Sequence, residues 1–486
     1  MSTEESCDVV VVGGGPSGST VASFVAMRGR RVLLLEKEFF PRYQIGESLL
    51  PSTVHGICGL LGVADKVAQA GFVRKHGGTF RWGASSDPWS FSFRLSPHMT
   101  GPTSHAYQVE RMKFDQILLD HARELGVDVR EGCRVTEVLE GDKRVRGLSY
   151  TDSAGERHVV AARFVVDASG NKSSIYRTVG LRRYSEFFKN VALFGYFTGG
   201  ERMPAPREGN IFCAAFDQGW FWYIPLSAGL TSVGAVVNSD FADSVRGNSA
   251  ECLLRLVNRC PPIKRMLSGV PRVTTGPYGD VRTRKDYSYL NSRFWRQGMV
   301  LVGDAAGFID PVFSSGVHLA TYSALLAARS INSVLAGTVD EARSFEEFEA
   351  RYRREYGRFY EFLMSFYDMN ADEQSYFWQA KKVTNCEYSE LESFAGLVGG
   401  VASLDTVLVD VESAEARLKP TSRELEQSLS HVRGAGSHDS ISPRQSEIAG
   451  TVKAEGSQVL AHAVQPLFDG GLIPSADGLA WTAPVS

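Results

Sequence analysis

The sequence predicts an α/β protein in which a parallel-sheet domain is interrupted by a mixed β-sheet domain and followed by a helical segment. The N-terminus carries a strand–helix–strand pattern, with apolar strands at residues 7–12 and 31–35. An apolar strand at 299–302 and a long helical pattern at 315–335 repeat this arrangement much later in the chain. Short apolar strands lie between the two, which indicates an inserted sheet.

Each element follows from a local pattern. Residues 7–12 include four consecutive valines, and residues 112–125 repeat apolar side chains at helical spacing before Gly126. Residues 351–367 predict an amphipathic helix rich in aromatic side chains, which favours core packing over a binding surface. The other predicted elements are helices at 19–28 and near 51–70, strand pairs within 127–150 and 156–166, and strands at 77–82, 90–93, 194–197, 221–225 and 231–237.

The dinucleotide-type domain is therefore discontinuous in sequence. Residues 434–450 are rich in serine and glycine, which is typical of a linker. We expect the first domain to comprise residues 1–80, 105–185 and 290–340, the β-rich substrate domain 81–104 and 186–289, the helical C-terminal segment 341–430, and the linker and tail 431–486.

Composition excludes several classes of function. The 486 residues carry a formal net charge of -3, which gives no electrostatic footprint for nucleic acid. The N-terminus lacks the pattern of a secretory signal, and no apolar run is long enough to predict a membrane span. The seven cysteines are scattered and form no C-x-x-C pair, so we expect free thiols, a cytoplasmic protein and no metal site.

A glycine-rich turn joins the first strand to the first helix. Gly13, Gly15 and Gly18, with Ser17 among them, follow the valine strand, and Glu36 follows the second strand. Glycines at these places let the backbone approach a pyrophosphate, and the helix N-terminus stabilises its charge. An acidic residue after the second strand accepts hydrogen bonds from ribose hydroxyls. The context predicts a Rossmann-type dinucleotide site.

Two later segments favour FAD over NAD as the dinucleotide. Residues 163–170 end a strand with Asp167 and a turn of small residues, and Asp304 follows the strand at 299–302. These segments and Arg111 resemble the FAD-dependent aromatic hydroxylases, in which such aspartates lie near the cofactor and such an arginine lies beside the flavin. The alternative interpretations are a helix cap for Asp304 and a surface ion pair or cap for Arg111.

A closer resemblance is to the flavin-dependent halogenases. The string Gly219-Trp220-Phe221-Trp222-Tyr223-Ile224-Pro225 matches their W-x-W-x-I-P pattern, and tryptophans two apart on a strand share one face. Lys75 stands where the family has its lysine, and residues 46–51 and 310–318 match further family strings. Taken alone, each pattern is more typical of a core strand, a surface lysine or a helix start.

The resemblance implies a role for each matched residue. Trp220 and Trp222 would form a wall beside the flavin, and Lys75 would hold or carry the oxidised halogen. The amides of Ser315 and Gly316, at a helix start, would hold the halide. The residues expected to bind FAD are Gly13, Gly15, Ser17, Gly18, Glu36, Arg42, Gly46, Ser48, Arg111, Asp304, Pro311 and Val317.

The chain departs from one subgroup of that family. Phe313 stands where the tryptophan halogenases have a glutamate that is proposed to assist proton removal from indole. We therefore expect a substrate other than free tryptophan. The chain most resembles the bacterial halogenases that act on phenols or pyrroles tethered to a carrier protein.

The resemblance also implies an activity and its partners. A separate flavin reductase would supply FADH2, and O2 would give a flavin hydroperoxide. Chloride or bromide would attack this hydroperoxide, and the hypohalous acid would reach Lys75 and halogenate an electron-rich ring. Expected partners are the reductase and an acyl or peptidyl carrier protein bearing a tyrosine-like phenol, with no nucleic acid and no membrane. The cofactor supplies most of this chemistry, and the protein orients the partners.

Two other activities share the FAD patterns. An aromatic monooxygenase would use NAD(P)H directly, and a double-bond reductase of the geranylgeranyl type would act on isoprenoids. Lys75, the tryptophan pair and the 313–316 turn weigh against the monooxygenase, and the reductase is expected to lack the tryptophan pair.

Overall fold

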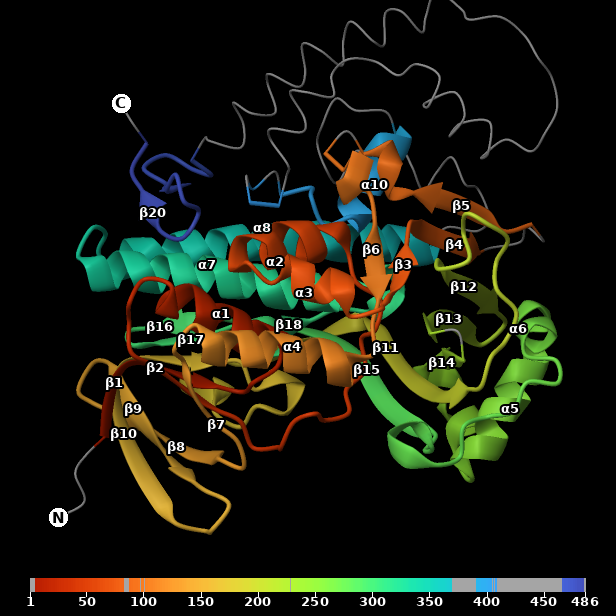
Figure 1. The fold of residues 1–486 in the computed structure, drawn as a ribbon, viewed down its shortest axis with the longest axis horizontal. Coiled ribbons are helices and arrows are strands. Elements are labelled where there is room, and N and C mark those ends of the chain that lie inside the picture. Colours follow the sequence, from red (N-terminus) through yellow and green to blue (C-terminus); the bar gives the residue numbers. More distant parts are fainter. Residues whose placement is uncertain are drawn as a thin grey trace, which may run out of the picture.

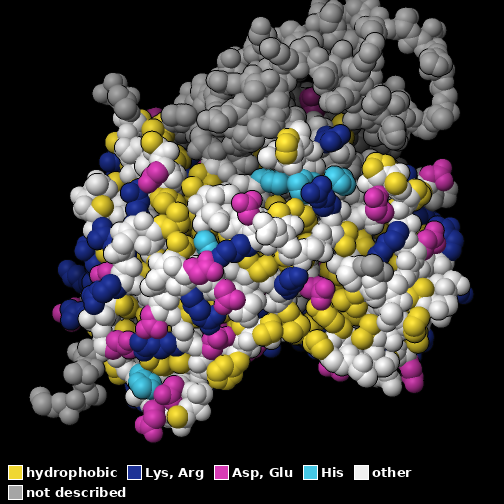
Figure 2. All heavy atoms as spheres, viewed as in Figure 1, with side chains coloured by type: hydrophobic (Ala, Val, Ile, Leu, Met, Phe, Trp, Pro, Cys, Tyr) yellow, Lys and Arg dark blue, Asp and Glu magenta, His cyan; other side chains and the backbone are white. Residues whose placement is uncertain are grey.

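The structure is a computed structural model that describes residues 5–82, 87–96, 98–99, 101–227, 229–368, 390–403, 405, 407–408 and 466–484. Two large sheets lie side by side, and long helices cover the first of them (Figure 1). Within the described ranges, no helix has both the length and the apolar character required to cross a bilayer. The face in Figure 2 mixes basic and acidic side chains and has no large area of one charge.

The first sheet is the one predicted from the valine strand. Its central strands follow the order β17-β10-β1-β2-β7 and are all parallel. Val10 pairs with both Val165 and Leu33, and the valines are buried because helices cover the sheet. The strands are β1 (Glu5–Val12), β2 (Val32–Leu35), β7 (Asp128–Arg130), β8 (Arg134–Glu140), β9 (Val145–Thr151), β10 (Arg157–Asp167), β16 (Trp295–Arg296) and β17 (Met299–Leu301).

The second sheet follows the order β18-β15-β11-β14-β13-β12-β4-β5. It is antiparallel except where β4 runs parallel to β12, so it is mixed as predicted. Two expected boundaries differ, because β4 and the start of β11 belong to this sheet although the sequence placed 77–80 and 182–185 in the FAD domain. The strands are β4 (Gly77–Arg81), β5 (Trp89–Ser92), β11 (Arg182–Phe197), β12 (Ile211–Phe216), β13 (Gly219–Ser227), β14 (Leu230–Asn238), β15 (Arg282–Asn291) and β18 (Gly307–Phe308).

Several elements differ from the sequence prediction. The expected helix near 51–70 is three short pieces, a π-helix Ser52–Ile57, α2 (Cys58–Leu61) and α3 (Ala64–Gln69). Strand β15 was not predicted, because its residues are mostly polar; it forms because β11 supplies a long partner. Helices α5 (Ser249–Arg259) and α6 (Pro261–Met266), also unpredicted, pack against the second sheet (Figure 1).

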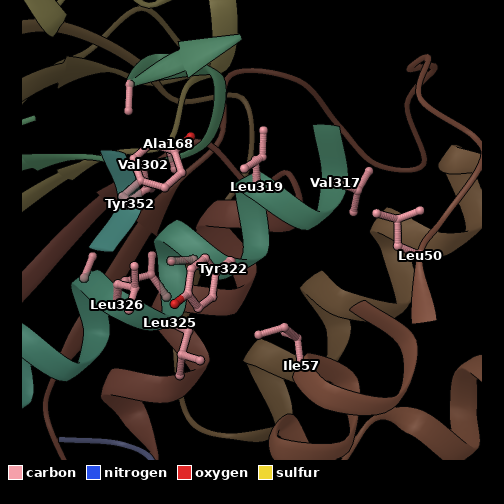
Figure 3. Close-up of a cluster of buried hydrophobic side chains, with 14 of the residues drawn as sticks. Leu50, Ile57, Ala168, Val302, Val317, Leu319, Tyr322, Leu325, Leu326 and Tyr352 are labelled. Atoms are coloured by element: carbon pink, nitrogen blue, oxygen red, sulfur yellow. The ribbon is translucent and has the colours of Figure 1, made fainter. Parts of the chain in front are cut away.

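Helix α7 (Gly316–Ala336) lies in the centre of the core. It is buried over most of its length because α1 (Pro16–Ala26), the π-helix and α8 (Glu341–Asp368) surround it. Figure 3 shows its side chains Val317, Leu319, Tyr322 and Leu325 among Leu50 and Ile57 of the N-terminal region. The remaining helices are α4 (Arg111–Glu124) and α10 (Glu390–Val398).

The C-terminal residues 466–484 cover α7. The Arg329 guanidinium donates to Asp405 Oδ2 at 2.6 Å and to Gly478 O at 2.7 Å, and Trp481 Nε1 donates to Ser330 Oγ at 2.9 Å. This part of the expected linker and tail is therefore a covering segment with its own strand pair, β19 (Ile473–Pro474) and β20 (Trp481–Thr482). The linker predicted at 434–450 lies outside the described residues.

Candidate active site

A cavity of about 340 Å³ lies between the two sheets, where the carboxyl ends of β1 and β10 meet the second sheet. Most residues expected to bind FAD line it, together with the two tryptophans and Gly316. Gly18, Ser315 and Lys75 do not line it. The lining site residues are Gly13, Gly15, Ser17, Glu36, Arg42, Gly46, Ser48, Arg111, Trp220, Trp222, Asp304, Pro311, Gly316 and Val317.

The glycine turn is built for close backbone approach. Gly13 has a φ of 104°, and a Cβ at Gly18 would lie 1.8 Å from Gly13 O, so helix α1 can start only with glycine there. The Gly14 amide donates to Glu36 Oε2 at 2.7 Å, and the Glu38 amide donates to Glu36 Oε1 at 2.9 Å. These bonds hold the carboxylate at the cavity wall, where it can accept from a ribose.

Arg111 is held by a carboxylate that the sequence did not single out. Its guanidinium donates to Asp115 Oδ1 at 2.7 Å and to Asp115 Oδ2 at 2.9 Å, one turn along α4. A third bond goes to Ile45 O at 2.5 Å, and Arg42 also donates to Asp115 at 3.0 Å. The ion pair expected as an alternative for Arg111 is thus present, yet it is buried and presents the arginine to the cavity.

The set of lining residues fits FAD. The glycine turn, the α1 N-terminus and Glu36 form one end, and Asp304, Pro311 and Val317 form the other. Amides and a helix start suit the pyrophosphate, the carboxylates suit sugar hydroxyls, and an apolar wall suits a flavin ring. The lining residues therefore offer suitable partners for the pyrophosphate, the sugar hydroxyls and the ring of FAD.

The turn before α7 is tied down by Asp310. Its carboxylate accepts from the Val312 amide at 3.1 Å, from Asn190 Nδ2 at 3.0 Å and from Tyr367 OH at 2.9 Å. Ser314 takes a φ of 62°, which turns the chain into the helix. Asp310 therefore fixes the backbone at the start of α7.

The first residues of α7 present polar groups near the cavity. The amides of the first turn of a helix have no intrahelical acceptor, and Gly316 lines the cavity. The Ser315 hydroxyl is buried and has no hydrogen-bond partner among the described residues. Such a turn can accept an anion, as the sequence predicts for the halide.

The two tryptophans occupy neighbouring positions on one face of β13. Their ring centroids are 6.2 Å apart, and both line the cavity. Trp222 Nε1 donates to Ser232 Oγ at 3.1 Å, and Gly234 opposite it leaves room, because a Cβ there would lie 2.2 Å from the Trp222 ring. Trp220 Nε1 donates to Tyr367 OH at 2.5 Å and so joins the same network as Asp310. These contacts hold both tryptophan rings in place at the cavity.

Lys75 ends the short strand β3 (Val73–Lys75), which pairs with β6 (Ala106–Gln108). The side chain is 2 % exposed, and its ammonium donates to Leu49 O at 3.0 Å and lies 5.4 Å from the centroid of the Phe93 ring. Burial lowers the pKa of Lys75 to about 7, while Cys213 acts in the opposite direction. No carboxylate pairs with it in the described part of the chain. Lys75 is therefore a buried amine that can be neutral near neutral pH.

Arg74 and His76, the neighbours of Lys75 in sequence, are less buried than the lysine. Arg74 is exposed and His76 is half-buried. His76 lies beside His105, with ring centroids 6.2 Å apart, and His55 packs on His105 at 4.8 Å. Histidine side chains form a row on this face in Figure 2. Among the described residues, neither Arg74 nor His76 hydrogen-bonds to the Lys75 ammonium, whose acceptor is Leu49 O.

Phe93, whose ring faces the Lys75 ammonium, belongs to a cluster of packed aromatic side chains. Phe313, which replaces the glutamate of one subgroup, packs against Phe366 with centroids 4.8 Å apart and against Phe394 of α10 at 6.2 Å. Phe91 lies 5.0 Å from Phe394 and 5.6 Å from Phe93. We call Phe91, Phe93, Phe313, Phe366 and Phe394 the aromatic chamber. Its walls fill the space beside the lysine.

Sequence reasoning missed three groups that the structure brings to the site. Glu47 lies within the matched string 46–51 but had no assigned role, and Asp115 lies one helical turn after Arg111. His318 bridges Ser52 Oγ and Glu355 Oε1, each at 2.9 Å, and ties α7 to its neighbours. The spacing of Asp115 was a usable signal, whereas the partners of Glu47 and His318 are distant in sequence.

Among the described residues no cluster of side chains is suited to a metal ion.

Known proteins are similar to this chain over most of its length. The family described as tryptophan halogenase matches residues 8–101 and 94–411. A tryptophan 2-halogenase of Chondromyces crocatus is 37% identical over 83% of this chain and 77% of its own length. The flavin-dependent halogenase armH3 of Armillaria mellea is 32% identical over 84% of this chain and 83% of its own.

Solved structures agree with this assignment. The myxobacterial chondrochloren halogenase CndH, described as a new variant of FAD-dependent halogenases, has a TM-score of 0.76 and 48% identity, covering 98% of this chain and 100% of that one. The flavin-dependent halogenase CmlS has a TM-score of 0.73 and 28% identity, covering 99% and 84%. The fold, the FAD-type cavity and these similarities place the chain in the tryptophan halogenase family, as a flavin-dependent halogenase.

Proposed function

We propose that the chain is a chlorinase that makes hypochlorous acid in the flavin cavity and uses it at Lys75. The chemistry supplied by reduced FAD is the transfer of two electrons to O2, and chloride supplies two more. Reduced FAD, O2, chloride and one proton are thereby converted to oxidised FAD, hypochlorous acid and water. A separate flavin reductase supplies the FADH2, and bromide can replace chloride.

The observation that carries this proposal is the buried amine of Lys75, with which no carboxylate pairs among the described residues. A neutral amine hydrogen-bonds hypochlorous acid, or exchanges one N–H for N–Cl and releases water. Because the pKa of Lys75 is about 7, much of the amine is neutral at physiological pH. A lysine needed only for solubility would not be 2 % exposed.

The other site residues separate the formation of hypochlorous acid from its use at Lys75. The amides of Ser315 and Gly316 hold the halide at the cavity, beside Pro311 and Val317. Trp220 and Trp222 stand as the cavity wall, so an organic substrate does not enter it. The acid passes to Lys75, which orients it toward one ring position.

The substrate class follows from the aromatic chamber. The apolar rings of Phe362, Phe366 and Phe394 that pack on Phe313 suit a neutral, electron-rich ring, and we propose a tyrosine-like phenol borne by an acyl or peptidyl carrier protein. The name of the Chondromyces crocatus relative points instead to tryptophan for that protein, so tryptophan is the second candidate.

A product panel tests the function. The chain is supplied with FADH2 from an unrelated reductase, with O2, and with either chloride or bromide. The substrates offered are phenols and pyrroles, each free and carrier-bound, and tryptophan. We expect halogenated phenol that falls at least about 100-fold in Lys75→Ala. The exposed Lys66, which pairs with Glu124, provides the control Lys66→Ala, which should keep the wild-type rate.

Hydroxylated product formed with NADPH alone, whether or not halide is present, would overturn the proposal. Halogenated tryptophan, with every phenol unchanged, would keep the halogenase and reject the phenol.

A further inference from the structure

A row of three hydrogen-bonded side chains starts at the flavin cavity. Glu47 lines the cavity and is 2 % exposed. Tyr196 OH donates to Glu47 Oε1 at 2.7 Å, and the hydroxyl oxygens of Tyr196 and Tyr43 are 2.7 Å apart. Tyr196 is completely buried, whereas Tyr43 is half-buried. The row therefore joins a buried carboxyl to a partly exposed hydroxyl.

The backbone around Glu47 is rigidly held. The Val109 amide donates to Glu47 O at 2.7 Å, and Arg111 Nη1 donates to Ile45 O at 2.5 Å. Glu47 Oε2 is buried, and among the described residues the Ser232 hydroxyl lies near enough to the carboxyl to lower its pKa, without completing a full hydrogen bond to this oxygen. A buried carboxyl oxygen without a full hydrogen bond is costly unless it carries a proton or meets a ligand.

The surrounding charges leave Glu47 able to exchange a proton near neutral pH. Burial raises the pKa of Glu47 to about 7, while the Tyr196 hydroxyl and the charge of Arg111 act in the opposite direction. Burial and the nearby Glu47 raise the pKa of Tyr196, so it passes protons as a neutral hydroxyl. Other titratable or charged groups nearby are Glu110, Tyr278, whose hydroxyl donates to Glu110 at 2.9 Å, Arg282, 3.5 Å from the Tyr43 ring centroid, and Arg284, whose charge also acts on Tyr43.

The chemistry of the cavity needs such a group. In the proposed function, on which this inference rests, each hypochlorous acid formed consumes one proton in the flavin cavity. A side chain must hold that proton, and it must be replaced before the next turnover.

We propose that Glu47 supplies the proton that hypochlorous acid formation consumes, and that Tyr196 and Tyr43 return one to it from solvent. Glu47 gives up its carboxyl proton and becomes a carboxylate. Tyr196 then passes its hydroxyl proton to Glu47 Oε1 as it takes one from Tyr43, which takes one from water. The tyrosines end as they began, and one proton has entered.

The path is tested in the FAD-loaded protein without turnover. We follow the infrared carbonyl band of the protonated carboxyl, both with pH and after mixing with D2O. The band should titrate near pH 7 and be absent in Glu47→Gln. Deuterium exchange should slow about 10- to 100-fold in Tyr196→Phe and in Tyr43→Phe. Tyr278→Phe is the matched control: its ring lies 4.6 Å from Tyr196 but its hydroxyl serves Glu110, so exchange should be unchanged.

The rates of the first and later turnovers test the proton path independently. In Tyr196→Phe the first hypochlorous acid should form at the wild-type rate and later ones slowly, because only the return of the proton is blocked. In Glu47→Gln the first should already be slow. Equal exchange in Tyr196→Phe and wild type, or a slow first turnover in Tyr196→Phe, would overturn the path while chlorination by the wild type upheld the proposed function. A wild type that makes no hypochlorous acid would reject the proposed function, whatever the exchange rates show.

Discussion

The flavin cavity and the aromatic chamber both adjoin the core face that carries Trp220 and Trp222, yet they are built differently. The cavity is open, with a volume of about 340 Å³, and is lined by glycines, carboxylates, arginines and two tryptophans. The chamber beside Lys75 is filled by phenylalanines from β5, the turn before α7, α8 and α10. One region is preformed for a cofactor, and the other must rearrange to admit a ring.

The difference indicates where specificity lies. A cavity formed by backbone turns and strand ends accepts one cofactor and changes little. A chamber of packed side chains can admit a substrate only if rings such as Phe394 move, so its occupants are selected by how well they replace those rings. The oxidant is made in the rigid region and used in the adaptable one.

The largest effect is expected from the glycine turn. Gly18→Ala places a Cβ 1.8 Å from Gly13 O, so the turn must open and FAD binding should be lost. Gly59→Ala, on α2 where nothing lies within 4 Å, is the matched control. Flavin absorbance retained after gel filtration measures the outcome. If both variants retain FAD, the flavin cavity is not the rigid region that we contrast with the aromatic chamber.

The tryptophan wall should have the next largest effect. Trp222→Ala removes a ring that is 6 % exposed and opens the wall, so chlorinated product should fall about 10- to 100-fold while FAD stays bound. The loss should come from oxidant or substrate crossing between the two regions. Product analysis with bound-flavin absorbance checks this, and unchanged turnover would remove the wall from the account.

The pH profile should show one limb from each region. The pKa of Lys75 is lowered to about 7 and the neutral amine is the active form, so chlorination should rise as pH increases through 7. The pKa of Glu47 is raised to about 7 and the protonated acid is the active form, so chlorination should fall above that value. A narrow bell centred near pH 7 results.

Glu47→Gln should lower the rate and remove the alkaline limb alone. If the alkaline limb persists in this variant, the loss of activity at high pH comes from another titrating group.

Much of the cavity was predictable, because its signals are local. The glycine turn, Glu36 and the strands around them are set by short-range spacing, and those strands form as predicted. The tryptophan pair and Lys75 were found from matched strings. Their burial could not be inferred, because it depends on β4, β12 and α10 packing together from distant parts of the chain. Glu47, Tyr43 and Tyr196 meet only when the second sheet closes on the first, so no spacing in the sequence reveals their contact.

The smallest effect is expected from the chamber itself. Phe394→Leu, on α10, keeps an apolar side chain but removes a ring that contacts Phe91 and Phe313. We expect a few-fold lower KM for bulky phenols with little change in the rate of FADH2 oxidation, since the smaller leucine leaves space in the chamber and does not line the flavin cavity. Steady-state kinetics over a size series of phenols measures it. An equal change for every phenol would show that Phe394 does not border the substrate.

The division of labour between the two regions is tested most directly by following the oxidant in Lys75→Ala. With FADH2, O2, chloride and the phenol present, chlorination of the phenol is measured together with chlorination of a small scavenger in bulk solvent. The account predicts that phenol product is lost while scavenger chlorination rises, because the cavity still makes hypochlorous acid and nothing beside the chamber retains it. Loss of both products would place Lys75 in the making of the oxidant and contradict the account.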